Sequence, residues 1–246
     1  MCTVSFIARR RGYLLAMNRD ERLTRVPGLP PKFRQSKMKR IVCPSEPGGG
    51  TWIALNETGV TLALINWYSI TARVGANAIS RGQVVVAAGH AGDPAEVEAA
   101  LEKSPLARTN PFRLIGIFPS SGEIVEWRWN LRQLVRLDHK WRTQQWISSG
   151  FDEPGAQRER SAAFRKAWRQ KSAGGLAWLR RLHRSHSPAK GPFSTCMHRA
   201  DAATVGSTEV AVSTRLGTIR HHDGPPCRQG HCSIRRLTLR AARKAT

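Results

Sequence analysis

The stretch Met1-Cys2-Thr3-Val4-Ser5-Phe6-Ile7-Ala8, followed by Tyr13-Leu14-Leu15-Ala16-Met17-Asn18, decides the fold. Apolar and polar residues alternate in both segments, which predicts two β-strands joined by the basic turn Arg9-Arg10-Arg11-Gly12. Antiparallel pairing of these strands brings Asn18-Arg19-Asp20-Glu21 back beside Cys2. The hairpin therefore predicts a cluster of reactive and charged groups at one end of a sheet.

Cys2 has the chemistry of a nucleophile once Met1 is removed, because one residue then carries both a thiol and a free α-amine. A thiol attacks as the thiolate and has an unperturbed pKa of about 8.5, so it needs a base or a positive field beside it. The α-amine, with an unperturbed pKa of about 7.7 to 8.0, serves as that base near neutral pH. We expect Asp20 to hold and orient the amine and Arg19 to bind an anionic group of the substrate.

Several motifs together resemble the NRDE protein family, also called the transport and Golgi organization protein 2 family. The motifs are, in order, Met1-Cys2, Asn18-Arg19-Asp20-Glu21, Gly49-Gly50-Thr51-Trp52, Gly59 to Asn66, Ser148 to Asp152, Cys196-Met197-His198 and Gly224-Pro225-Pro226-Cys227. That family is similar to N-terminal-nucleophile hydrolases. The resemblance implies an α+β fold, a four-layer αββα sandwich of two antiparallel sheets flanked by helices. It also implies one domain over residues 1–239, followed by a basic C-terminal tail over 240–246.

The resemblance adds further site residues. In related hydrolases with an N-terminal cysteine, an Asn in the second hairpin contributes to the oxyanion hole, and by position that residue is Asn66 here. We expect Cys2, Asp20 and Asn66 to be catalytic. The residues expected to bind substrate are Arg19, Trp52 and Trp67.

The sequence is compatible with two functions. The first is a cysteine-dependent hydrolase acting on an amide or thioester of a small or acyl-bearing substrate. The second is a carrier, because members of the family are implicated in haem trafficking and in lipid or acyl-CoA homeostasis. In the carrier, Asn18 to Glu21 pin the hairpin, Cys2 is a small buried apolar residue, and His198, His221 or His222 is a candidate haem ligand.

The formal net charge of +23 raises the question of an acidic partner. The basic residues are mostly arginines spread along the whole chain, and the densest stretch lies between Arg158 and Lys190. We interpret that stretch as a solvated helix face, since no nucleic-acid-binding motif accompanies it. Nucleic acid is therefore an unlikely partner, and we expect a small-molecule or acyl ligand instead.

Five cysteines with irregular spacing do not predict a disulfide framework. The zinc ligands that the sequence offers are Cys196, His198, Cys227, His231 and Cys232. Their spacing matches no compact zinc motif, so we expect ordinary thiols and histidines, no metal and no organic cofactor. No apolar run approaches the ~20 residues of a membrane span and no secretory signal is visible, which predicts a cytoplasmic protein. The sequence leaves the oligomeric state open.

The remaining elements follow from hydrophobic periodicity and turn residues. The proline-rich segment 22–47 predicts a long irregular loop. Helices are expected within 80–104, with Asp93 as the N-cap of the second, and within 158–183. Strands are expected at 51–55, 60–66, 112–118, 123–129, 134–138, 193–198, 203–212, 215–222 and 233–239.

Overall fold

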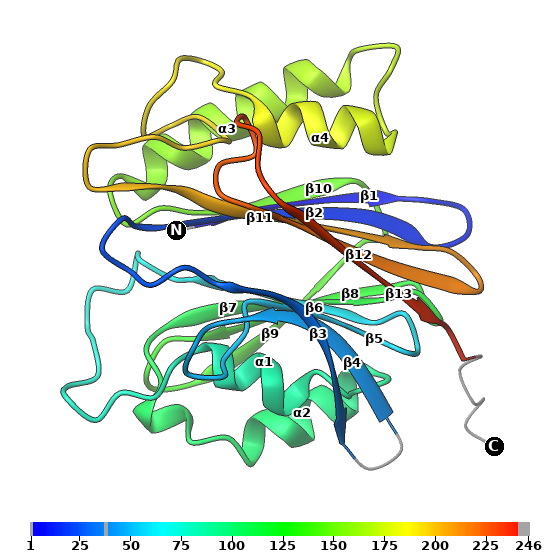
Figure 1. Cartoon of the computed structure of the whole chain (residues 1–246). Coiled ribbons are helices and arrows are strands. Elements are labelled where there is room, and N and C mark those ends of the chain that lie inside the picture. Colours follow the sequence, from blue (N-terminus) through cyan, green and yellow to red (C-terminus); the bar gives the residue numbers. More distant parts are fainter. Residues whose placement is uncertain (1, 37–38, 241–246) are drawn as a thin grey trace.

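The protein folds as four layers, with two antiparallel sheets between two pairs of helices (Figure 1). The computed structural model describes residues 2–36 and 39–240. One sheet has the strand order β10-β1-β2-β11-β12-β13, and the other has the order β3-β4-β5-β6-β7-β8-β9. This arrangement confirms the α+β αββα sandwich expected from the sequence.

The bounds of the elements are as follows. The six-stranded sheet contains β1 (Cys2–Ala8), β2 (Tyr13–Arg22), β10 (Gln144–Ser148), β11 (Ala202–Val212), β12 (Leu216–Asp223) and β13 (Cys232–Thr238). The seven-stranded sheet contains β3 (Leu29–Ser36), β4 (Lys39–Ser45), β5 (Ile53–Asn56), β6 (Thr61–Asn66), β7 (Phe112–Phe118), β8 (Glu123–Trp129) and β9 (Leu134–His139). The helices are α1 (Gly82–Ala88), α2 (Pro94–Glu102), α3 (Glu153–Trp168) and α4 (Leu176–Arg184).

The alternation in β1 places its side chains on two different layers, because successive residues of a strand point to opposite faces. Cys2, Val4 and Phe6 belong to the core between the two sheets. Ile7 belongs to the cluster under α3 and α4, together with Trp178. The pattern that predicts the strand therefore also puts the Cys2 thiol between the sheets.

The helices cover the outer face of each sheet (Figure 1). Val85 of α1 and Val97 of α2 pack with Trp127 of β8, while Leu179 and Leu182 of α4 pack on the other sheet. The expected cap is present, since the Asp93 side chain accepts a hydrogen bond from the Glu96 backbone N–H at 2.8 Å. Among the described residues, no helix combines the length and apolar character that crossing a bilayer requires.

The expectation of an irregular loop over 22–47 is wrong. Most of this segment forms the hairpin β3–β4 at the edge of the seven-stranded sheet, although residues 37–38 of its turn lie outside the described range. Pro30 and Pro31 fit because they lie where the register with β4 shifts, and a sheet edge tolerates residues without an N–H donor. Prolines that predict a loop thus mark an edge strand here.

Two further predictions differ from the structure. Residues 144–148 form β10, which pairs with β1, although the sequence pattern did not predict this strand. The expected strand at 193–198 is instead a turn-rich loop with a single bridge between His198 and Ala203. The strands at 112–118 and 123–129 have the predicted bounds. The predicted basic tail at 240–246 lies outside the described residues except for Arg240, whose guanidinium is 3.4 Å from Glu57.

Candidate functional site

The hairpin β1–β2 brings Cys2, Arg19 and Asp20 close together, as predicted. Cys2 pairs with Arg19 and Thr3 pairs with Asn18, so Asp20 lies one residue beyond the register partner of Cys2. A cavity of about 300 Å³ opens over this end of the hairpin. Its walls include five of the six predicted site residues, which are Cys2, Arg19, Asp20, Trp52 and Asn66.

Cys2 is one of the residues in the wall of this cavity, and 7% of the residue's surface is exposed. Burial raises the pKa of the thiol, and the positive charge at the start of the chain acts in the opposite direction. A hydrogen bond from the backbone of Asp20 also lowers the pKa, while the Asp20 carboxylate raises it. The thiol therefore stays protonated at neutral pH unless a base beside it removes the proton.

The Asp20 carboxylate is buried and held by two side chains. Its Oδ1 accepts a hydrogen bond from Thr204 Oγ1 at 2.6 Å, and its Oδ2 pairs with Arg160 Nη1 at 3.1 Å. Thr204 lies opposite Asp20 in the β2–β11 ladder, next to a register shift between Thr204 and Gly206. Such a bulge changes the direction of neighbouring side chains, which aims the Thr204 hydroxyl at the carboxylate.

Arg160 is a buried residue that the sequence analysis missed. It lies in the basic stretch that we expected to be a solvated helix face, yet its side chain is fully buried. Its Nη1 also donates to Thr3 Oγ1 at 2.7 Å, and its Nη2 donates to the Pro192 carbonyl at 3.1 Å. The helical periodicity of the stretch alone did not distinguish this inward position from the exposed arginines around it.

Arg19 lies over the ring of Trp52, with the guanidinium carbon 4.6 Å from the ring centroid. Two carboxylates flank it, Glu21 at 3.4 Å and Glu46 at 3.5 Å, and Arg25 lies 2.8 Å from both of them. The charge of Arg19 is therefore shared within a network of two arginines and two glutamates. A substrate anion has to compete with these glutamates for Arg19.

Arg81 also lies in the cavity wall, and the sequence analysis did not single it out. Burial lowers the pKa of its guanidinium, and Nη1 donates to the Pro111 carbonyl at 3.3 Å. Within the described residues, it has no carboxylate at ion-pair distance. It is thus better placed than Arg19 to meet an anionic group of a ligand.

Asn66 ends β6 and is one of the residues that line the cavity. Its Nδ2 donates one hydrogen bond to Tyr68 Oη at 2.8 Å, which leaves its second N–H unassigned. Trp67 is not among the cavity-lining residues of the described chain; its ring instead lies 5.8 Å from the Arg128 guanidinium. The structure therefore brings Asn66, but not Trp67, to the predicted cluster.

The three histidines considered as haem ligands do not meet at this cavity. His221 is buried beside Thr208, 2.9 Å from its hydroxyl, and its Nε2 lies 3.2 Å from Asp223. His222 lines a smaller cavity on the other side of its strand. His198 lies in a loop with Cys196 and Cys227. None of them is among the described residues that line the cavity beside Cys2.

Of the five cysteines and histidines that the sequence offered as zinc ligands, the structure groups three, Cys196, His198 and Cys227. The other two have different partners. Cys232 Sγ accepts from Arg220 Nη2 at 2.8 Å, and His231 lies 3.5 Å from Asp223.

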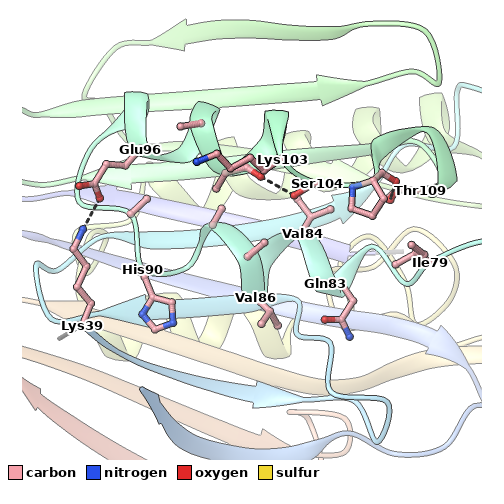
Figure 2. Close-up of a pocket in the computed structure, with 16 residues that line it drawn as sticks. Lys39, Ile79, Gln83, Val84, Val86, His90, Glu96, Lys103, Ser104 and Thr109 are labelled. Atoms are coloured by element: carbon pink, nitrogen blue, oxygen red, sulfur yellow. Dashed lines mark hydrogen bonds and ion pairs between the residues drawn. The ribbon is translucent and has the colours of Figure 1, made fainter. Parts of the chain in front are cut away.

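A larger cavity, about 790 Å³, lies on the opposite side of the seven-stranded sheet, beside α1 and α2. Figure 2 shows Lys39 paired with Glu96 at one end of it and Ile79 and Thr109 at the other. The hydroxyls of Ser104 and Thr109 in its wall both donate to backbone carbonyls. Both hydroxyls are therefore engaged as hydrogen-bond donors to the backbone.

The chain matches one protein family by sequence and several solved structures by fold. The sequence model of the family "Transport and Golgi organisation 2" matches residues 1–156. No curated protein matches the sequence. Among solved structures, penicillin V acylase from Agrobacterium tumefaciens is similar, with 14% identity, a TM-score of 0.55 and coverage of 95% of this chain and 85% of that chain.

Two structures of conjugated bile acid hydrolase from Clostridium perfringens are also similar, one a cysteine-to-alanine mutant and the other an arginine-to-leucine variant. Each has 10% identity and a TM-score of 0.53, with all of both chains covered. At such low identities the likeness is one of fold.

Proposed function

Because the chain belongs to the Transport and Golgi organisation 2 family and has the fold of these acylases and hydrolases, we propose that it is an N-terminal-nucleophile hydrolase. Cys2 is the nucleophile, and the scissile bond is an amide or thioester of a small acyl substrate. Cleavage of the Met1–Cys2 peptide bond produces the active form.

The observation that carries the proposal is the convergence of three groups on one cavity. Cys2, Asp20 and Asn66 come from β1, β2 and β6, and all three residues line the same cavity. A purely structural Cys2 has no need of a cavity beside it. A hydrolase needs the nucleophile, the group that orients its base and the oxyanion donor at one place.

The chemistry balances with these groups alone. The α-amine of Cys2 takes the thiol proton, and the resulting thiolate attacks the acyl carbon to form a C–S bond. Asn66 Nδ2 donates to the oxyanion of the tetrahedral intermediate. The intermediate collapses by breaking the bond to the leaving amine or thiol, which takes the proton from the ammonium. Water, deprotonated by the amine, then hydrolyses the thioester and restores the thiol.

Asp20 supports this cycle as a positioning residue. Thr204 and Arg160 fix its carboxylate, so it presents a constant orientation to the end of β1. The Asp20 charge stabilises the protonated α-amine that forms after the thiol proton has moved. The bonds to Thr204 and Arg160 thus act on catalysis through the orientation of the base.

The cavity also indicates the class of substrate. A volume of about 300 Å³ is at the lower end for ligand pockets, which favours a short acyl group. Arg81 supplies a positive group that no carboxylate of the described chain neutralises directly. We therefore place a carboxylate or another small anionic group of the substrate at Arg81, with the acyl carbon at Cys2.

The alternative function, a carrier for haem or for acyl-CoA and lipid, has less support in this geometry. The candidate iron ligands His198, His221 and His222 do not line the cavity in the described chain. The wall of this cavity also carries charges of both signs, from Arg19, Arg25, Arg81, Asp20, Glu21 and Glu46, rather than a uniformly basic surface. Titration with haemin tests this function, and a Soret shift that is lost when one of these histidines is replaced supports it.

The hydrolase proposal is tested by labelling the thiol with an alkyne-tagged β-lactone, which acylates activated cysteines. Intact-mass measurement first establishes that Met1 has been removed. Peptide mapping is then expected to find the acyl group on Cys2. The Cys2→Ala variant loses the label while keeping the thermal unfolding midpoint, and Cys232→Ala keeps the label. Labelling confined to Cys43, Cys196, Cys227 or Cys232 contradicts the proposal.

A further inference from the structure

Four side chains from two loops converge on one point on the outer side of the six-stranded sheet. His186, Cys196 and His198 belong to the loop that follows α4, and Cys227 belongs to the connection between β12 and β13. Each offers one ligand atom, and the four atoms lie within 4.8 Å of one another. We propose that these residues form a structural zinc site, which departs from the expectation of no metal drawn from the sequence.

The three distances from His198 to the other ligand atoms match the geometry of a tetrahedral zinc site. His198 Nε2 lies 3.2 Å from His186 Nε2, 3.6 Å from Cys196 Sγ and 3.4 Å from Cys227 Sγ. Bonds of about 2.0–2.1 Å to nitrogen and about 2.3 Å to sulfur place tetrahedral ligand atoms about 3.3 to 3.8 Å apart. The separations from His198 therefore fit a common centre about 2 Å from each ligand.

Hydrogen bonding does not explain the same contacts. A neutral imidazole nitrogen has either one proton or one lone pair, so it makes one hydrogen bond. His198 Nε2 has three close neighbours, which are a second imidazole nitrogen and two thiol sulfurs. One nitrogen cannot form a well-directed hydrogen bond with all three neighbours, whereas a cation at the centre is bound by all four atoms.

The backbone holds the ligands in place independently of the metal. The Cys196 N–H donates to the Ser185 carbonyl at 3.0 Å, and the His198 N–H donates to the Gly191 carbonyl at 3.1 Å. The loop that carries Cys227 is attached to α4, because Arg184 Nε donates to the Pro226 carbonyl at 2.6 Å. Preorganised ligands reduce the ordering cost of metal binding.

The donor set selects the ion and its role. Two thiolates and two imidazoles are a common ligand set of structural zinc, and four protein ligands leave no open position for substrate or water. Cys196 is buried and the other three residues are partly buried, so the ion is shielded but reachable from solvent during loading. The site therefore fastens the two loops together and does not take part in acyl transfer.

The zinc site lies behind the carboxylate of the candidate active site. Met197, between two of the ligands, donates its backbone N–H to Thr204 Oγ1 at 2.8 Å, and Thr204 donates in turn to Asp20. Fixing the loop thus fixes a hydrogen-bond chain that ends at Asp20. The metal site itself does not depend on whether Cys2 is catalytic.

The first test is the metal content of protein purified under reducing conditions without chelator, measured by elemental mass spectrometry. We expect one zinc ion per chain. Loss of a residue that only hydrogen-bonds to a metal ligand already costs about 10- to 100-fold in metal affinity. Cys227→Ser removes a ligand itself, so it is expected to lower the retained zinc by at least about tenfold. The matched control is the variant Cys232→Ser. Cys232 is also partly buried and lies five positions further along the chain, but it is not one of the proposed ligands. This variant is expected to keep the zinc.

The second test uses cobalt and needs only the wild-type chain, so it stands even where a variant does not fold. Zinc is removed with a chelator, and Co²⁺ is added to the reduced protein. We expect the visible bands of tetrahedral cobalt together with thiolate-to-cobalt charge transfer, and displacement of both by added zinc. Wild-type protein that binds neither ion overturns the proposal, and so does equal loss of metal from the Cys227→Ser and Cys232→Ser variants.

Discussion

Arg160 and Asp20 form an ion pair between two side chains that are both inaccessible to solvent, with Nη1 3.1 Å from Oδ2. The two residues are 140 positions apart, one on α3 and the other on β2. The pair joins the helical layer to the strand that carries the candidate site. It therefore links the stability of the fold to the orientation of Asp20.

Arg160→Met is expected to destabilise the protein by about 3 to 5 kcal/mol, because it removes the buried positive charge that faces the buried Asp20 carboxylate. The free energy of unfolding is measured by urea denaturation. The exposed Arg158 on the same helix is the matched control, and Arg158→Met is expected to change this free energy by less than about 0.5 kcal/mol. Equal effects of the two substitutions contradict the prediction.

Asn66→Ala is expected to lower kcat by about 10²- to 10³-fold while changing KM little, because an oxyanion donor acts mainly in the transition state. The measurement is the release of free thiol from a short-chain acyl thioester. Tyr68→Phe removes the hydroxyl that accepts a hydrogen bond from Asn66 Nδ2, and it is expected to lower kcat less than Asn66→Ala does. If Asn66→Ala has the wild-type kcat, Asn66 is not the oxyanion donor.

Arg81→Leu is expected to raise KM for an acyl thioester with a terminal carboxylate, such as a glutaryl thioester, by about tenfold or more. KM for the uncharged pentanoyl thioester is expected to stay near its wild-type value, since it has no group to pair with the guanidinium. Arg81→Lys retains the positive charge and is expected to recover part of the loss. If Arg81→Leu raises KM equally for both thioesters, the substitution has changed the cavity in general and Arg81 does not bind the carboxylate.

Acid is expected to destabilise the protein through His183, a histidine that the sequence did not single out. Burial, together with the nearby Arg160 charge, lowers the pKa of His183 to about 3. Its Nδ1 donates to Asn18 Oδ1 at 3.0 Å, since the Asn18 Nδ2 group already donates to two carbonyls, and its Nε2 accepts from Ser5 Oγ at 2.9 Å. The folded protein therefore keeps this ring neutral.

The sign of the effect follows from proton binding. Between pH 6.5 and about 3, the unfolded chain binds a proton on His183 and the folded chain does not. The free energy of unfolding thus falls as the pH falls, by about 1.4 kcal/mol per pH unit from this residue. Burial also lowers the pKa of His221, to about 4, which adds to the same trend.

A substitution in the core lowers the free energy of unfolding at every pH. The control therefore compares the slope of this free energy against pH, not its absolute value. His183→Gln is expected to reduce the pH dependence of the free energy of unfolding below pH 6.5. Replacement of the exposed His231 by Gln is expected to leave the wild-type slope. A wild-type slope in His183→Gln shows that other groups account for the acid sensitivity.

The sequence predicted those elements whose pattern is local. The strands at 112–118 and 123–129 alternate regularly, and the second helix of the 80–104 region begins at an Asp-Pro cap, so both follow from short-range rules. The β3–β4 hairpin was missed because prolines predict a loop unless the chain is known to lie at a sheet edge. Strand β10 was missed because its pairing partner, β1, is more than a hundred residues away.

The sequence by itself determined the β1–β2 hairpin, the side of the strand on which Cys2 lies, and the closeness of Arg19 and Asp20 to it. Alternation and a short turn decide these features. Only the tertiary structure decided that Arg160 is buried against Asp20, that Arg81 shares the cavity, and that His186 joins Cys196, His198 and Cys227. These relationships depend on packing between layers and on contacts between separate loops. Local sequence patterns do not predict which residues from distant parts of the chain come into contact.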